Sequence, residues 1–176
     1  MIIGYRHCDS RFPFLWSHPA QPSARWHGAG EGPTNYFADT PVGAWAEFLR
    51  HEEIKTASDL EGVRRSLWAV ELPDADYTRP SLSAGELRGG KQTYGACQAE
   101  ARRLRAAGAQ RLETDSAALV GSGASGWVAH PDIAASSISR DGRVFVIFGL
   151  QPALVGWPAV EGGSPPERVL NLVNHF

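Results

Sequence analysis

The run Arg143-Val-Phe-Val-Ile-Phe148 constrains the fold of this chain more than any other segment. Side chains alternate between the two faces of a strand, and this run is apolar on both of them. A strand with two apolar faces belongs in the interior of a sheet, where neighbouring structure covers both sides. We therefore predict a sheet with Arg143–Phe148 as a central strand.

The remaining elements predicted from the sequence mix strands and helices in an irregular order. Strands are expected at residues 2–6, 35–38, 67–72, 111–113 and 117–120, with a last edge strand at 169–173. Loops punctuated by glycine or proline are expected at residues 78–90, 121–126 and 152–166. Because strands and helices do not alternate regularly, we predict a single α+β domain over residues 1–176. Its small central sheet, mixed or antiparallel, should be flanked by helices.

Capping signals and apolar spacing predict three helices. The strongest begins at Thr40-Pro41, because threonine is a good N-cap and proline suits the first helical position, and it ends within residues 51–54. Ser58-Asp-Leu-Glu61 has the spacing of a capping box and predicts a short helix over residues 59–65. A second long helix is expected over residues 92–107.

The charge balance and the absence of common motifs exclude several function classes. Seventeen Lys plus Arg against nineteen Asp plus Glu give a net charge of −2, which argues against binding nucleic acid or a membrane through a general basic surface. Cys8 and Cys97 are too few for a disulfide framework and have no CxxC spacing, and the six histidines have no paired metal-ligand spacing. The GxGxxG, phosphate-loop and GxSxG motifs are absent from the sequence.

The apolar segments are too short for a membrane protein. None reaches the roughly 18–20 residues of a spanning helix, and residues 1–8 show no basic region followed by a long apolar stretch. We therefore expect no secretory leader and a cytoplasmic protein. The six tryptophans serve either core packing or stacking on a flat ligand, and exposed aromatic side chains would suit a homodimer contact.

Residues 23–53 carry the side chains best suited to chemistry. Arg25 opens a turn with three glycines between residues 28 and 32, Tyr36 follows on a strand, and Glu47 lies on the capped helix, eleven residues after Tyr36. Arginine offers a planar fork to phosphate oxygens, tyrosine a flat face to a ring, and glutamate an acceptor to sugar hydroxyls. The glycines would let the main chain approach a ligand. Together these residues suit a nucleotide-like substrate.

Each of these residues also has a purely structural explanation. Glu47 lies roughly 140° round the helix from Val42, at about 100° per residue, and thus off the apolar stripe, as a solvated glutamate would. Arg25 alone is more typical of a surface ion pair. Tyr36 alone is typical of a core aromatic with a hydrogen-bonded hydroxyl, and Trp26 suits either the core or a ligand wall.

Two segments resemble the RES domain family, which is named for an arginine, a glutamate and a serine. The first is Arg25-Trp26, a glycine-containing turn, a Tyr-x-Ala strand and a helix with Ala-x-x-Glu; the second is Leu112-Glu-Thr-Asp-Ser116-Ala-Ala-Leu119. The resemblance implies a fold similar to ADP-ribosyltransferases and a bacterial toxin that breaks the nicotinamide–ribose bond of NAD⁺. It also implies a helix-turn-helix antitoxin as partner, with NAD⁺ as substrate and no bound cofactor or metal.

The resemblance assigns roles residue by residue. The family arginine, tyrosine, glutamate and serine fall on Arg25, Tyr36, Glu47 and Ser116, with Ser122 and Ser125 as alternatives for the serine. It implies that Glu47 stabilises positive charge on the ribose and that Ser116 hydrogen-bonds the ribose or the nicotinamide amide. The expected substrate contacts are the diphosphate at Arg25 and the nicotinamide at Tyr36, with Trp26 as the candidate for a further ligand wall. From its place at the end of the first strand, Arg6 is a candidate for a further phosphate contact, although a surface charge is the favoured explanation.

The acceptor of the ribosyl group leaves no sequence motif. Hydrolysis by water and phosphorolysis by phosphate both remain open, and so does ADP-ribosyl transfer to a protein. A catalytically silent binding protein with the same fold is the alternative of a different class. Convergence of Arg25, Tyr36 and Glu47 on one cleft would favour the enzyme.

Overall fold

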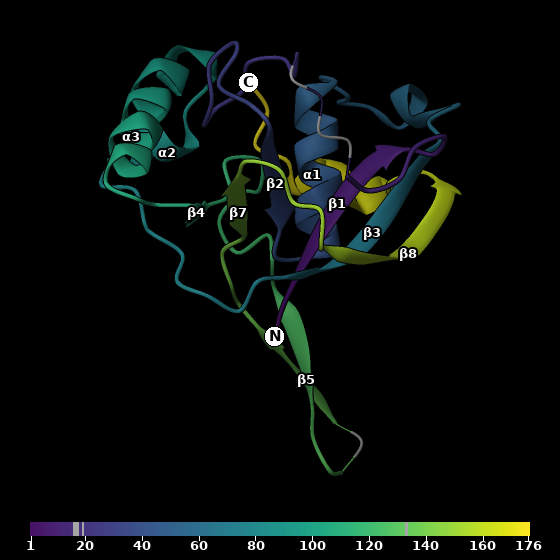
Figure 1. Ribbon diagram of the computed structural model, residues 1–176. Coiled ribbons are helices and arrows are strands. Elements are labelled where there is room, and N and C mark those ends of the chain that lie inside the picture. The colour runs from purple at the N-terminus through teal and green to yellow at the C-terminus, as the bar shows by residue number, and fades with distance from the viewer. Residues whose placement is uncertain (16–17, 19, 133) are drawn as a thin grey trace.

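A six-stranded antiparallel sheet organises the protein in the computed structural model, which describes residues 1–15, 18, 20–132 and 134–176 (Figure 1). The strands lie in the order β4-β7-β2-β1-β3-β8. Their bounds are β1 (Ile2–Asp9), β2 (Thr34–Ala38), β3 (Arg65–Leu72), β4 (Arg111–Asp115), β7 (Arg143–Phe148) and β8 (Val155–Gly163). The predicted interior position of Arg143–Phe148 is confirmed, because β7 lies between β4 and β2.

The helices do not alternate regularly with the strands, which confirms the predicted α+β class. They are α1 (Pro41–His51), α2 (Ala84–Arg88) and α3 (Tyr94–Ala106), with 3₁₀ helices η1 (Ala57–Leu60), η2 (Lys91–Thr93) and η3 (Glu167–Leu172). A separate hairpin of β5 (Gly126–Ala129) and β6 (Ala135–Ile138) projects from the body of the protein in Figure 1.

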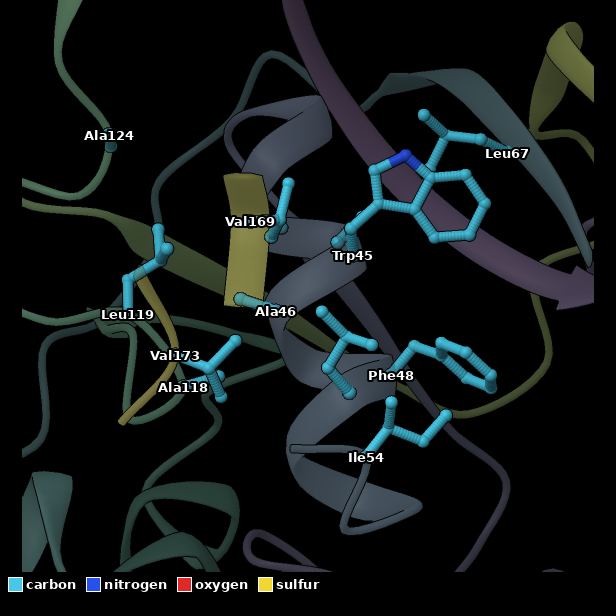
Figure 2. Close-up of a cluster of buried hydrophobic side chains, with 13 residues drawn as sticks. Trp45, Ala46, Phe48, Ile54, Leu67, Ala118, Leu119, Ala124, Val169 and Val173 are labelled. Atoms are coloured by element: carbon cyan, nitrogen blue, oxygen red, sulfur yellow. The ribbon is translucent and has the colours of Figure 1, made fainter. Parts of the chain in front are cut away.

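Helix α1 begins where its capping signal predicts. The Thr40 side chain accepts a hydrogen bond from the Gly43 amide at 3.0 Å, and Pro41 occupies the first turn, where its missing N–H costs nothing. The buried side of the helix packs against strands β1 and β2 and reaches Leu67 of β3. Figure 2 shows this cluster, with Trp45 directed toward Leu67 of β3. Apolar packing therefore fixes the helix on the sheet.

Helix α3 covers the same face of the sheet as α1. Its buried side chains pack with Leu112 and Val146, which are paired across β4 and β7. Ala38 belongs to the α1 cluster and pairs with Val144, which belongs to the α3 cluster. Paired residues point to the same face, so both long helices lie on one side. The opposite face, with Phe37 and other apolar side chains, is covered by loop side chains.

The sheet is split between its two middle strands. The pairing of β1 with β3 runs from Ile2–Leu72 to Asp9–Arg65, whereas the recorded pairing of β1 with β2 is Tyr5 with Ala38. Beyond Tyr5 the two strands therefore diverge, and the last part of β1 leaves β2. This divergence exposes side chains of both strands to a common space.

Two predicted segments differ from the structure, each because of a helix cap that was not predicted. The short helix expected at residues 59–65 is η1, which starts earlier: the Thr56 amide donates to Asp59 at 3.0 Å. β3 then begins at Arg65, which leaves no room for the predicted helix. The segment expected as a loop at residues 78–90 contains α2, because Ser83 and Glu86 cap its first turn reciprocally.

The C-terminal predictions are also corrected. Residues 117–120 do not form a strand: Leu119 makes an isolated bridge with Val173, and the 169–173 segment is largely the 3₁₀ helix η3. The 152–166 segment contains β8, an edge strand that tolerates Pro158 because one of its edges is unpaired. The β5–β6 hairpin was not predicted. All of its strand residues are exposed, so it lacks the alternation of apolar and polar side chains that indicates a half-buried strand.

Within the described ranges, none of the helices combines the length and the apolar character needed to span a bilayer.

Candidate active site

A cavity of about 570 Å³ lies along the divergence of β1 and β2, with α1 as a third wall. Strand β1 contributes residues 5–9, and β2 contributes residues 36–38. Of the side chains predicted for the site, Arg6, Arg25, Trp26, Tyr36 and Glu47 all line this cavity. The predicted convergence of Arg25, Tyr36 and Glu47 on one cleft is therefore observed.

Glu47 is held by the predicted serine. The Ser116 hydroxyl donates to Glu47 Oε1 at 3.2 Å, and Ser116 Oγ accepts from the amides of Ala118 and Leu119 at 3.2 and 3.3 Å. Ser116 is 2% exposed, and its own amide donates to Gly142 O at 2.8 Å. The serine is thus fixed on a tight turn, with its single proton directed at the carboxylate.

The alternatives for the family serine lie elsewhere. Ser122 and Ser125 are exposed, and they bond to Ser139 and to the Ser122 carbonyl, respectively. None of the three serines lines the cavity itself, but Ser116 reaches it through its hydrogen bond to Glu47. Of these serines, the structure therefore brings Ser116 to the glutamate.

Burial raises the pKa of the Glu47 carboxyl above its ordinary value. The charges of Arg50, His51 and Arg25 and the hydrogen bond from Ser116 oppose this rise. The interpretation of Glu47 as a solvated helix residue is therefore wrong. Its carboxyl is a desolvated group facing a cavity, where a carboxylate interacts strongly with a nearby positive charge.

The guanidinium of Arg25 is engaged by main-chain carbonyls. It donates to Gly89 O at 2.6 Å and to Glu86 O at 3.2 Å, and its charge lies 4.8 Å from the centre of the Tyr94 ring. These contacts tie the segment before β2 to the α2–α3 junction. The surface ion pair considered for Arg25 is absent from its described contacts, and most of its donors are already used within the protein.

Tyr36 presents its ring to the cavity while its hydroxyl is satisfied behind it. The hydroxyl accepts from the Trp26 amide at 3.1 Å and lies 2.8 Å from His27 Nδ1. The other ring nitrogen of His27 lies 2.9 Å from Pro22 O, which cannot donate, so Nε2 carries the proton and the tyrosine donates to Nδ1. Burial raises the pKa of Tyr36 and lowers that of His27, and both groups stay neutral.

Trp26 belongs mainly to the core. It is 1% exposed and packs in the cluster beneath α3, although part of it reaches the cavity wall. Its location favours the structural explanation over a ligand contact.

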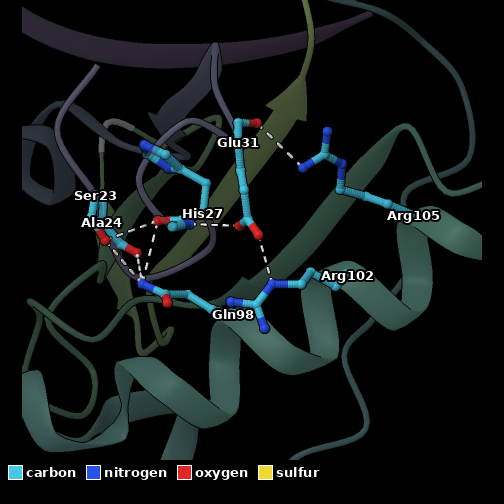
Figure 3. A network of polar contacts seen from close by, with 8 residues as sticks. Ser23, Ala24, His27, Glu31, Gln98, Arg102 and Arg105 are labelled. Atoms are coloured by element: carbon cyan, nitrogen blue, oxygen red, sulfur yellow. Dashed lines mark hydrogen bonds and ion pairs between the residues drawn. The ribbon is translucent and has the colours of Figure 1, made fainter. Parts of the chain in front are cut away.

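The glycine-rich turn faces α3 and not the cavity. The Gly28 amide donates to Glu31 Oε2 at 2.6 Å, and Arg102 of α3 donates to the other carboxylate oxygen at 2.6 Å. Figure 3 shows Glu31 between Arg102 and Arg105. The Arg105 side chain donates to the main-chain carbonyl of Glu31. The expectation that these glycines let the main chain approach a ligand is wrong, since none of residues 28–32 lines the cavity.

Several cavity residues were missed by sequence reasoning. They come from five separate segments: His7, Arg50, Arg65, Tyr94 and Phe176. Arg50 is the one with a sequence signal, because it follows Glu47 by three residues and thus shares its side of α1. Its guanidinium donates to Ala117 O and, at 2.8 Å, to Gly89 O, the carbonyl that Arg25 also binds.

Among the residues with described positions, no group of three His, Cys, Asp or Glu side chains could hold a metal ion. The cavity offers the Glu47 carboxyl beside Ser116, two further carboxyls, four arginines and an aromatic wall.

The comparison with known proteins identifies the family of the chain. The profile of the RES domain family matches residues 5–162, which covers Arg25, Tyr36, Glu47 and Ser116. The family is generally associated with NAD-utilising toxins. No curated protein matches the chain. Since the match covers most of the sequence, the chain belongs to the RES domain family.

Proposed function

We propose that this protein cleaves the nicotinamide–ribose bond of NAD⁺. One observation carries the proposal: Glu47, hydrogen-bonded by Ser116, faces a cavity that it shares with Arg25 and Tyr36. A cavity of about 570 Å³ is within the range of small-molecule sites. Its mixture of arginines and aromatic walls suits a molecule that joins phosphates to flat rings.

The chemistry needs little beyond a placed negative charge. When the C1′–N bond breaks, its electron pair goes to the pyridinium nitrogen and nicotinamide departs neutral. The ribose is left as an oxocarbenium ion, which the Glu47 carboxylate stabilises directly or through the ribose hydroxyls. An acceptor then bonds to C1′; with water as acceptor, one proton is lost and ADP-ribose forms.

Ser116 acts on this reaction through Glu47. Because its one hydroxyl proton is donated to Glu47 Oε1, it has none left for the ribose or the nicotinamide amide. Ser116 is therefore a positioning residue that orients the carboxylate and favours its ionised form. Tyr36 likewise donates to His27, so it serves as an apolar wall for the nicotinamide ring.

Nicotinamide release from NAD⁺ by the purified protein tests the proposal. The wild-type protein should release nicotinamide, and Glu47→Gln, which keeps the shape of the side chain, should lose that activity by about a hundredfold or more. Glu52→Gln is the matched control, since Glu52 is exposed at the end of the same helix. No release by folded wild-type protein, with or without phosphate, would refute the proposal. A requirement for phosphate would identify a phosphorylase.

A cellular role follows from family membership. We propose that the protein acts as a toxin by depleting NAD⁺ and that a helix-turn-helix antitoxin neutralises it. Induced expression should arrest growth and lower cellular NAD⁺, whereas the Glu47→Gln variant should do neither. Growth arrest by both proteins would contradict this role.

A further inference from the structure

The charges that line the cavity are mostly positive. Four arginines contribute to its walls: Arg6, Arg25, Arg50 and Arg65. Its carboxylates are Glu47, Asp9 and Asp115, and two of these already have arginine partners outside the cavity wall. The Asp9 carboxylate accepts hydrogen bonds from Arg11 Nε and Nη2, both at 2.9 Å, and Asp115 Oδ2 lies 3.7 Å from Arg88 Nη2. The cavity is therefore suited to an anion.

Two of the four arginines have little capacity left for a ligand. Arg25 and Arg50 both donate to Gly89 O, and each binds a further main-chain carbonyl. Arg6 donates to Asn35 Oδ1 at 3.1 Å and keeps other N–H groups. The assignment of the diphosphate to Arg25 thus meets a difficulty, because the protein itself satisfies most of that guanidinium.

Arg65 differs from the other three arginines. Its Nη2 lies 3.0 Å from His7 Nδ1, its guanidinium lies over the Phe48 ring at 5.0 Å, and its buried Nε has no acceptor. Like the other three, it forms no ion pair with a carboxylate within the described part of the chain, but it alone among the four has a buried donor without an acceptor. A buried donor without an acceptor is unusual in a folded protein and indicates a missing partner.

His7 adds a neutral donor beside Arg65. Burial, together with the charges of Arg65, Arg6 and His51, lowers the pKa of His7 to about 3. The imidazole is therefore neutral, and since Nδ1 accepts from Arg65, the proton resides on Nε2. At this end of the cavity the free groups are donors, which is the arrangement that phosphate oxygens require.

From this arrangement we infer that Arg65, with His7, binds the diphosphate of the dinucleotide. The inference rests on the proposed function and deepens it, because it separates the anion subsite on β1 and β3 from the reaction site at Glu47. A diphosphate would supply acceptors to the open donors of Arg65 and to His7 Nε2. The planar fork of Arg65, supported by the Phe48 ring, suits two oxygens at once.

The test compares Arg65→Gln with Arg64→Gln, since Arg64 is the exposed neighbour outside the cavity. Calorimetry measures the affinity for ADP-ribose, and kinetics measure nicotinamide release from NAD⁺ and from nicotinamide riboside, which has no phosphate. We expect Arg65→Gln to weaken ADP-ribose binding and to raise KM for NAD⁺ by about tenfold or more, with kcat changed by less than about threefold. Nicotinamide riboside should react equally with all three proteins, and Arg64→Gln should match the wild type.

A measurement on the wild-type protein keeps the inference falsifiable if Arg65→Gln fails to fold. The ring ¹⁵N resonances of His7 should shift when ADP-ribose is added and stay in place with nicotinamide riboside. Unchanged His7 resonances at saturating ADP-ribose would overturn the subsite.

The outcomes separate this inference from the proposed function. Nicotinamide release with unaltered KM in folded Arg65→Gln would overturn the subsite and leave the reaction standing. Binding of ADP-ribose that depends on Arg65, without nicotinamide release from NAD⁺, would support the subsite and refute the reaction. Absence of both would refute both.

Discussion

Removal of the Ser116 hydroxyl provides a quantitative test of the Glu47 site. Hydrogen bonds to charged groups contribute about 1.5–3 kcal/mol, and the 3.2 Å contact to Glu47 Oε1 belongs at the lower end of that range. About 1.5 kcal/mol corresponds to roughly one pH unit. Because the serine lowers the pKa of Glu47, Ser116→Ala should raise it further by about that amount.

The pH dependence of nicotinamide release would reveal this change. Activity needs ionised Glu47, so the acidic limb of kcat/KM should move upward by about one pH unit in Ser116→Ala, while activity on the alkaline side of that limb changes less. Ser116 also accepts two main-chain amides, so the free energy of unfolding should fall by about 1–2 kcal/mol. Both quantities are measured on the same preparations, by initial rates and by urea denaturation.

Ser125→Ala is the matched control, because Ser125 is exposed and bonds away from the cavity. It should leave the acidic limb in place. An acidic limb that stays at the wild-type pH in folded Ser116→Ala would refute the reasoning, since the serine would then have no electrostatic effect on the glutamate.

Three further predictions concern stability. Glu47→Gln should raise the melting temperature at neutral pH. The pKa of Glu47 is higher in the folded than in the unfolded protein, so ionisation of Glu47 lowers the stability of the wild type as pH rises above the pKa of the unfolded state. In acid, where Glu47 is protonated in both states, the difference in melting temperature should vanish. An equal gain at all pH values would contradict this cause. Leu112→Ala should lower the free energy of unfolding by about 2–5 kcal/mol in urea denaturation, because the side chain is fully buried, whereas Leu150→Ala, at an exposed site, should change it by less than about 0.5 kcal/mol. Gly142→Ala should cost about 1–3 kcal/mol by the same assay, since its new Cβ would lie 2.5 Å from Leu119 Cδ1; a neutral effect would show that this turn adjusts freely.

The features that the sequence predicted well are governed by neighbouring residues. Thr40 and Pro41, at the first turn of α1, determine where that helix begins. Strand β7 was predicted correctly because its own side chains are apolar on both faces. Around Thr56 and Ser58, by contrast, two residues of the same kind compete for one cap, and Thr56 takes it with Asp59 as its partner. Local signals of this kind leave such a choice undetermined.

Only some of the residues that line the cavity could be predicted from the sequence, and the reason here is a different one. Glu47 and Ser116 were identified through a family pattern, but the hydrogen bond between them was not predicted, because they are 69 residues apart in sequence. His7 and Arg65 are 58 residues apart in sequence and meet because β1 and β3 pair in one antiparallel register. A shift of one residue would turn either side chain to the other face, and no periodicity along a single strand determines that register.

The shared carbonyl of Gly89 has a consequence for how the cavity of this protein could change in shape. Arg25 precedes the strand at one side of the cavity and Arg50 ends the helix at another, and both are tethered to that one oxygen, at 2.6 and 2.8 Å. A single peptide group therefore acts as a spacer that sets the distance between two walls. Changes confined to the junction of α2 and α3 would therefore widen or narrow the cavity and alter the size of molecule that fits, without replacing Arg25 or Arg50.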